Sequence, residues 1–304
     1  MITGTNKGSG FGIARQLARE GILVYLVLRA GNLSTTILYM EPDFIYKVVA
    51  SILIGGTWVA LSTVLVEKLG TKTGGLIAGL PSTVVVALFF IGMSQGTDAV
   101  VAATTVVPLA FAVNGPFLLA YAALAKRGWW QAMVPALGIW FGLSYLIIVF
   151  RLDDFFWGVV ICGLLLTLVT VIFERTFNAF STAGQRADFG WGQLLTRALF
   201  AGTIIGTAVL ASRFLNPLFG GILASFPAVF VSTLIILHRS RGAAVSVGLA
   251  KSLLISGSVN VISYIIAIRY LYGSVGLYWG TLLGLLVSLL SAYLTHRFIM
   301  QKLK

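Results

Sequence analysis

The sequence has few charged residues, since Asp, Glu, Lys and Arg together make up only 10% of its 304 residues. Soluble domains carry about 25%. Apolar residues make up 58%, more than a single soluble core can bury, which excludes an ordinary soluble domain and a large extramembrane domain. Lipid offers no hydrogen-bond partner to a free backbone. The sequence therefore predicts an all-α polytopic membrane protein, whose first partner is the lipid bilayer.

Other scarce residues limit the chemistry. A lone cysteine, Cys162, excludes a disulfide framework and a cysteine-rich metal site. No His-x-x-x-His spacing occurs, no apolar segment holds a Ser/His or paired-carboxylate set, and Asp98, Asp153 and Asp154 fall at segment ends. We therefore expect no enzyme, no cofactor and no bound metal. The net charge of +12 would favour nucleic acid in a soluble protein, but here it reports topology, so no nucleic-acid partner is expected.

The first 39 residues follow a different pattern. Residues 3–10 read T-G-T-N-K-G-S-G, before a helix-like segment at 11–20 and a strand-like segment at 22–28 that ends at Arg29. This resembles the opening of a short-chain dehydrogenase, which implies NADP pyrophosphate at the glycine loop and its 2′-phosphate near the basic residue.

The resemblance stops there, because the family's catalytic Tyr-x-x-x-Lys has no counterpart. An NADP-dependent dehydrogenase fragment fused to a membrane domain is the least favoured function. We expect residues 1–39 to be a dispensable, non-functional appendage, with Met40 as a natural start.

Nine apolar segments are long enough to cross a bilayer. They are residues 44–66, 74–94, 98–124, 129–150, 155–173, 193–213, 218–238, 243–271 and 274–296. Alternate connections between these segments fall on the same side of the membrane, and twelve basic residues lie in the connections of one side. The connections of the opposite side hold only Arg151, Arg213 and Arg269, and Lys47 lies at the first span. The positive-inside rule then predicts a multi-pass plasma-membrane protein with an outside N-terminus and a cytoplasmic C-terminus. The twelve are Lys68, Lys72, Lys126, Arg127, Arg175, Arg186, Arg197, Arg239, Arg241, Arg297, Lys302 and Lys304.

An internal repeat is the strongest signal. Residues 74–82, G-G-L-I-A-G-L-P-S, align with residues 220–228, G-G-I-L-A-S-F-P-A, and the offset of 146 gives 11 identities over residues 74–114. The two blocks lie five predicted crossings apart, an odd number, so the equivalent helices should run in opposite directions. The sequence predicts two inverted four-helix repeats, residues 40–150 and 191–304, joined by a linker helix and hinge loop at 151–190.

Residues 74–91 also resemble the central motif of the GlpM-like family, small four-helix inner-membrane proteins about one repeat long. The resemblance is loose, covers about 20 residues in each half and implies no substrate. It makes a fused inverted pair a plausible descendant of a small antiparallel dimer, and leaves a homo-oligomer open.

A proline inside each block predicts a kinked or broken helix, the feature that marks midplane sites in transporters built from inverted repeats. A tolerated kink in a close helix contact is the competing interpretation. Asn114 and Asn260 should lie deep in their spans, as interhelical hydrogen-bond partners or as ligands. Lys251 is the one cation predicted to lie deep in a span. It is either a snorkelling residue or a contact for an anionic solute. The predicted substrate site comprises Gly79, Pro81, Ser82, Asn114, Ser225, Pro227, Lys251 and Asn260.

We therefore expect a secondary transporter or exporter of an unidentified small solute. A membrane structural or assembly factor is the alternative.

Overall fold

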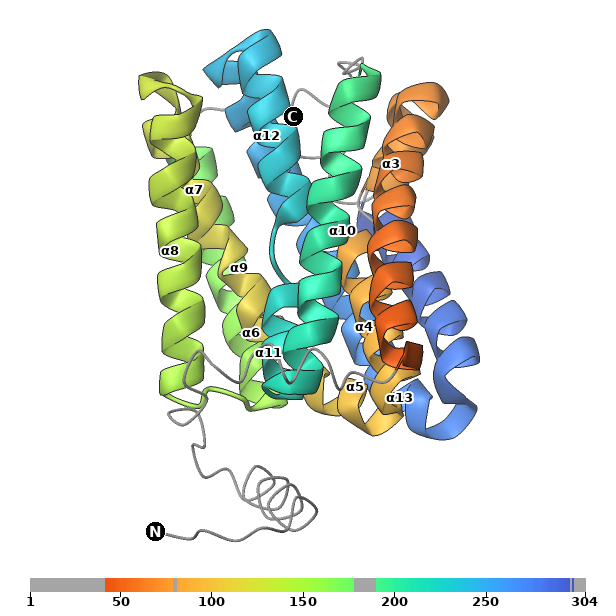
Figure 1. The fold of residues 1–304 in the computed structure, drawn as a ribbon. Coiled ribbons are helices and arrows are strands. Elements are labelled where there is room, and N and C mark those ends of the chain that lie inside the picture. Colours follow the sequence, from red (N-terminus) through yellow and green to blue (C-terminus); the bar gives the residue numbers. More distant parts are fainter. Residues whose placement is uncertain (1–41, 79–80, 178–189, 296, 298–304) are drawn as a thin grey trace, which may run out of the picture. The chain divides into compact units, whose positions relative to one another are not determined.

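The computed structural model describes residues 42–78, 81–177, 190–295 and 297. The chain divides into Met1–Ile45 and Tyr46–Lys304, and the second unit holds almost all of the described residues. The dehydrogenase-like appendage, Gly79 and most of the predicted hinge loop lie outside the described residues. Every regular element in the described part is a helix (Figure 1).

The first half contains seven helical elements. The breaks after α5 and α6 divide the predicted third span, and Pro108 in the first turn of α6 lacks the N–H that would continue the preceding helix. Gly128 ends η2 with φ of 131°, a conformation that glycine adopts without strain. The elements are α3 (Pro42–Ala78), α4 (Ser82–Gln95), α5 (Thr97–Thr104), α6 (Val107–Ala112), α7 (Asn114–Leu124), the 3₁₀ turn η2 (Ala125–Arg127) and α8 (Trp129–Val149).

The linker helix and the second half follow. Asn216 caps α11, because its side chain accepts a hydrogen bond from the Leu218 N–H, and Pro217 occupies the first helical position. Gly276, with φ of 77°, kinks α13 where the eighth and ninth predicted spans meet. The elements are α9 (Phe155–Phe177), α10 (Trp191–Phe214), α11 (Pro217–Ala224), α12 (Ala228–Arg241) and α13 (Ala243–Thr295).

Seven helices in the described residues are long and apolar enough to cross a membrane. This confirms the prediction of an all-helical membrane protein and differs from the predicted nine spans. One cause is the break before α4, which leaves that helix at 14 residues. The other is α13, which runs through two predicted spans as one 53-residue element despite the kink at Gly276.

The antiparallel contact between α3 and α10 depends on glycines. Gly56 approaches the carbonyl of Ala198, and Gly202 approaches the carbonyl of Ile52, so closely that a Cβ added at either glycine would lie 2.6 Å or 2.4 Å from that oxygen. Residue numbers rise along α3 as they fall along α10, and Figure 1 shows the two helices running in opposite directions. Small residues allow this backbone approach, a common basis of helix packing in membranes.

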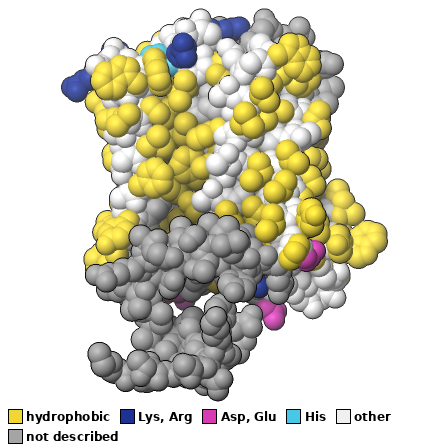
Figure 2. Space-filling view, viewed as in Figure 1, with side chains coloured by type: hydrophobic (Ala, Val, Ile, Leu, Met, Phe, Trp, Pro, Cys, Tyr) yellow, Lys and Arg dark blue, Asp and Glu magenta, His cyan; other side chains and the backbone are white. Residues whose placement is uncertain are grey.

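The core lies between α7, α8, α12 and α13, where Phe117, Tyr121, Trp140, Leu234 and Leu254 are fully buried. The outer faces are apolar as well, and Figure 2 shows hydrophobic side chains across the middle of the bundle. Large exposed side chains such as Phe141, Phe156 and Leu164 would be costly in water and suit lipid. Together with the seven apolar helices, this surface marks an integral membrane protein.

Candidate functional site

The break between α11 and α12 is a tight turn around Pro227. The proline has φ of −78° and ψ of 49°, and the Ala228 N–H donates to the Phe226 carbonyl across it at 2.8 Å. This is the geometry of an inverse γ-turn. Proline favours it because its ring fixes φ and its nitrogen has no hydrogen to continue the helix of α11. The chain therefore starts a new helix at Ala228.

The break before α4 has the same backbone geometry. Pro81 has φ of −75° and ψ of 53°, and the bounds of α4 and α12 correspond residue for residue at the offset of 146. Val85 and Val231 each donate to the carbonyl of their proline at 2.8 Å. Gly96 and Gly242 end the two helices, each with φ of 88°. The predicted Gly/Pro interruption is thus a helix boundary in both halves, and the buried Ser82 begins α4.

Asn114 connects the first half to the break in the second. Its side chain is completely buried at the start of α7. The amide Nδ2 donates to the Ser225 carbonyl at 3.4 Å, and the amide Oδ1 accepts from the Trp140 indole at 3.0 Å. Ser225 is also buried, and its hydroxyl donates to the Gly221 carbonyl. The structure therefore brings two predicted site residues, Asn114 and Ser225, into direct contact.

Asn260 occupies the corresponding position in α13 and is 1% exposed. Its Oδ1 accepts from the Ser291 hydroxyl at 3.1 Å, and its backbone carbonyl accepts from Ser288 at 3.1 Å. Each asparagine oxygen thus accepts from a later helical segment, α8 for Asn114 and the part of α13 beyond Gly276 for Asn260. The donors are an indole in the first half and a hydroxyl in the second, so the two environments are related but not identical.

Aromatic rings surround the break in the second half. Phe226 contacts Trp140, Phe141 and Phe200, with ring centroids 5.0, 5.9 and 6.0 Å apart. Phe226 is 5% exposed and Trp140 is 1% exposed. The polar break therefore lies against an apolar aromatic wall, the combination typical of small-molecule sites.

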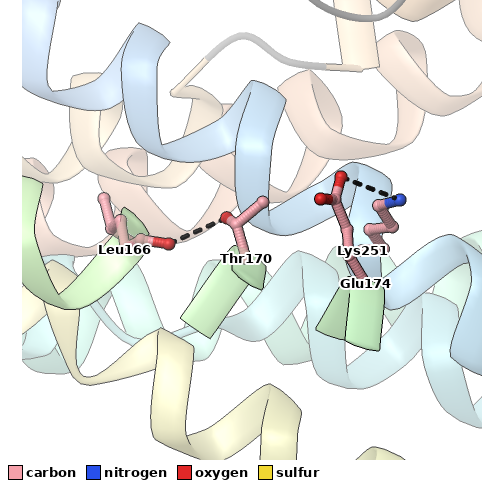
Figure 3. Close-up of polar contacts among 4 residues, drawn as sticks. All are labelled: Leu166, Thr170, Glu174 and Lys251. Carbon is pink, nitrogen blue, oxygen red and sulfur yellow. Dashed lines mark hydrogen bonds and ion pairs between the residues drawn. The ribbon is translucent and has the colours of Figure 1, made fainter. Parts of the chain in front are cut away.

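Lys251 lies away from this arrangement. Figure 3 shows its amine facing Glu174 of α9, and the Nζ–Oε1 distance is 3.4 Å. Glu174 lies one helical turn after Thr170 on α9. Thr170 itself donates to the Leu166 carbonyl. Nine residues separate Lys251 from Asn260 along α13, about 13 Å at the helical rise. The structure thus gives Lys251 a carboxylate partner on the linker helix rather than a contact with the break.

Arg269 holds the same two helices at their other end. Its guanidinium lies 4.4 Å from the Phe155 ring centroid at the start of α9. It also donates to the Val101 carbonyl and to the hydroxyls of Thr104 and Thr105. These contacts join α13 to α5 and cap the end of α5, where a cation is favourable.

Two further polar groups have positions that no local sequence pattern indicates. The positive-inside pattern places Arg197 in a cytoplasmic connection, but this residue lies inside α10 and is 4% exposed. Tyr121 and His238 contact each other across 117 positions of the sequence, a separation that no local pattern indicates. Among the described residues, no three His, Cys, Asp or Glu side chains gather as a metal site would require.

We expect Asn114→Leu to lower the free energy of unfolding by about 1 to 2 kcal/mol, because it leaves the Ser225 carbonyl and the Trp140 N–H without their partner. Trp140→Phe removes only the indole donor and keeps a ring against Phe226. A double-mutant cycle on the two, measured by unfolding in detergent micelles, should give a coupling energy of about 0.6 kcal/mol. Strictly additive effects would show that the bond contributes nothing.

The comparison with known families finds one match. The family described as Protein of unknown function (DUF3147) matches residues 48–152 and again residues 194–302, together more than two thirds of the chain. No curated protein and no solved structure matches. The two matched segments begin 146 residues apart, the offset of the repeat, in α3 and α10. The chain therefore belongs to the family of unknown function DUF3147, whose profile it matches twice.

Proposed function

We propose that the two matched segments are inverted repeats related by a pseudo-two-fold axis in the membrane plane. The reciprocal α3–α10 contact supports this, since Gly56 and Gly202 are equivalent at the offset of 146, as are Ile52 and Ala198. A contact in which two equivalent patches exchange partners is what a two-fold axis produces. In this proposal the chain crosses the membrane nine times, with α4 and both arms of α13 among the crossings.

The charge distribution supports an orientation. In the face shown in Figure 2, basic side chains gather at the upper end of the bundle, and the visible acidic ones lie at the lower end, where a basic side chain is also seen. Lys126 and Arg127 in η2 and Arg239 and Arg241 at the end of α12 occupy connections that the proposed topology places on one side. We place that side in the cytoplasm of a cell with this protein in its plasma membrane.

The function that the geometry favours is secondary transport of a small polar solute, without catalysis. The observation that carries this proposal is the pair of proline breaks, Pro81 and Pro227, with the same backbone angles in both segments. Paired broken helices in inverted repeats are the sequence and structural pattern of midplane transport sites. A break frees backbone N–H and C=O groups, and the side-chain amide of Asn114 already binds one such carbonyl.

Two features bear on the nature of the solute. Glu174 compensates the charge of Lys251, so selectivity for an anion does not follow from that cation. The groups at the break are neutral carbonyl, hydroxyl and amide groups beside aromatic rings. A small neutral or zwitterionic solute with hydrogen-bonding groups and an apolar part fits them best.

A structural or assembly factor is the second candidate. The close packing of Phe226 among three aromatic rings favours it, because such a contact stabilises a bundle without any ligand. The two functions differ in whether water reaches the break. A transporter must open it to each side in turn, whereas a structural bundle keeps it closed.

Thiol modification tests this difference. In a Cys162→Ala background, Ser225→Cys should react with a membrane-impermeant methanethiosulfonate in vesicles, although Ser225 is 1% exposed in this conformation. The control is Ser144→Cys on α8, at a residue that is 4% exposed. We expect the variant at the break to react at least about tenfold faster, because an open state exposes it. Equal protection of both thiols would support the structural factor instead.

A further inference from the structure

A buried polar cluster joins the two halves at the end of α12. The Tyr121 hydroxyl of α7 lies 2.9 Å from His238 Nδ1 of α12 and 3.0 Å from the Ser246 hydroxyl of α13. Ser246 Oγ lies 3.5 Å from the same imidazole nitrogen and donates to the Ala243 carbonyl at 2.9 Å. Tyr121 and Ser246 are completely buried, whereas His238 is partly exposed. The imidazole thus connects a buried hydrogen-bond chain to the surface.

This geometry accommodates both protonation states of His238. In the neutral state, the tyrosine O–H donates to Nδ1 and the other ring nitrogen carries the proton. When a proton from bulk water adds to Nδ1, the new N–H donates to the tyrosine oxygen. The tyrosine O–H then turns to the Ser246 oxygen, and the serine still donates to the Ala243 carbonyl. A proton can therefore bind and leave without leaving a buried polar group unpaired.

The charged groups around α12 are mostly basic, apart from Asp98 of α5 and the carboxylate paired with Lys251, so an imidazolium at His238 would lie among like charges. Arg239 itself stacks on Trp129 of α8. The charged groups on α12 and on the elements packed against it or against α7 and α13 are Arg239 and Arg241 of α12, Arg197 and Arg213 of α10, Lys126 and Arg127 of η2, Lys251 and Arg269 of α13, Glu174 and Arg175 of α9, and Asp98 of α5.

The cluster has no symmetric counterpart at the other end of the bundle. At the offset of 146, the counterparts of Tyr121, His238 and Ser246 are Ala267, Gly92 and Val100, which are all apolar. Apolar groups would serve a packing role, as the equivalent contact of Val100 with Gly92 shows. The polar cluster at one end of the bundle is therefore a feature that the two repeats do not share.

The same two helices lead from the cluster to the break. Asn114 and Tyr121 lie seven residues apart on α7, two turns along one face. Asn114 binds the Ser225 carbonyl beside the start of α12, and Tyr121 binds His238 near its end. A change in the contact at one end of this helix pair acts on the other end, because helices transmit such displacements as rigid units.

We propose that Tyr121, His238 and Ser246 form a proton-binding site that couples opening of the Pro227 break to pH, with a proton as the coupling ion. The inference rests on the proposed transport function. Protonation reverses the donor and acceptor roles between α7 and α12 and adds a positive charge among basic groups, which loosens the contact between the helices. Proton binding therefore shifts the population towards the open break.

The test follows the reaction rate of Ser225→Cys in the full chain, with Cys162→Ala, in liposomes of phosphatidylethanolamine and phosphatidylglycerol. Dividing by the rate at the exposed Ser274→Cys removes the pH dependence of the thiol itself. We expect the ratio to rise at least about fivefold between about pH 8 and pH 5.5, the range over which histidine titrates. His238→Gln, which keeps a hydrogen-bonding side chain, should abolish this rise.

Three results are distinguishable. A rise that His238→Gln removes supports the proton site, and Tyr121→Phe should weaken the rise if the glutamine variant does not fold. A reactive break with no pH dependence, or with one that survives both substitutions, overturns the proton site and leaves the transport function standing. A break that is unreactive at every pH overturns both.

Discussion

Gly202→Ala is expected to lower the free energy of unfolding by about 2 to 3 kcal/mol, a large effect for the addition of one methyl group. The new Cβ would lie 2.4 Å from the Ile52 carbonyl oxygen, closer than any real contact of this kind. The obstacle is backbone, so no side chain can rotate away. Helix α10 must move away from α3, which also weakens the neighbouring contact of Gly206 with Ile52.

Gly56→Ala should have a similar effect, because its Cβ would meet the Ala198 carbonyl at 2.6 Å. The double variant should lose clearly less free energy of unfolding than the two single variants together, since the helix separation that relieves one clash also relieves the other. Gly138→Ala in the exposed face of α8, where a Cβ meets nothing within 4 Å, is the control and should show no loss. Unfolding in detergent micelles measures the stability of these four variants relative to the unchanged protein. Equal stability of Gly138→Ala and Gly202→Ala would show that this contact does not hold the bundle together.

The sequence was sufficient for the features that depend on local chemistry. Proline is unfavourable inside a helix, and the breaks at Pro81 and Pro227 are found where the repeated block predicts them, although α8 accommodates Pro135 without a break. Buried asparagines require partners, and Asn114 and Asn260 have them. The membrane class followed from composition alone, because nothing but lipid accommodates so much apolar surface.

Features that depend on which helices meet could not be predicted. The partner of Lys251 is Glu174, which lies one residue beyond the predicted span 155–173, but α9 continues to Phe177 and carries the carboxylate within reach of α13. Arg197 is buried for a related reason, because α10 begins at Trp191 and takes the arginine into its second turn. Hydropathy gives the approximate span of a helix, and packing decides which polar side chains end up inside.

The count of spans shows the same limit. Hydropathy treats residues 98–124 as one segment, whereas a turn at residues 105–106 separates α5 from the span that begins at Val107. Two predicted spans meet at Gly276, where the chain reverses through one glycine with a positive φ and no intervening loop. These interruptions depend on a few residues, which hardly change the mean hydropathy of a span-length window of sequence.

The proposed inverted arrangement places equivalent positions of the two repeats on opposite sides of the membrane. Asp98 and Ala244 are equivalent at the offset of 146, both are exposed, and both lie one residue into the helix that follows a glycine turn. The turns at Gly96 and Gly242 have the same φ, so local structure does not distinguish the two positions.

The decisive measurement is therefore the sidedness of labelling at these two positions, each changed singly to cysteine in a Cys162→Ala background. An impermeant maleimide should label Asp98→Cys in intact cells whose outer face is accessible to it, and should label Ala244→Cys only in inverted vesicles. The effect is all or none in each preparation. Labelling of both variants from the same side would contradict the inverted arrangement, and with it the proposed function.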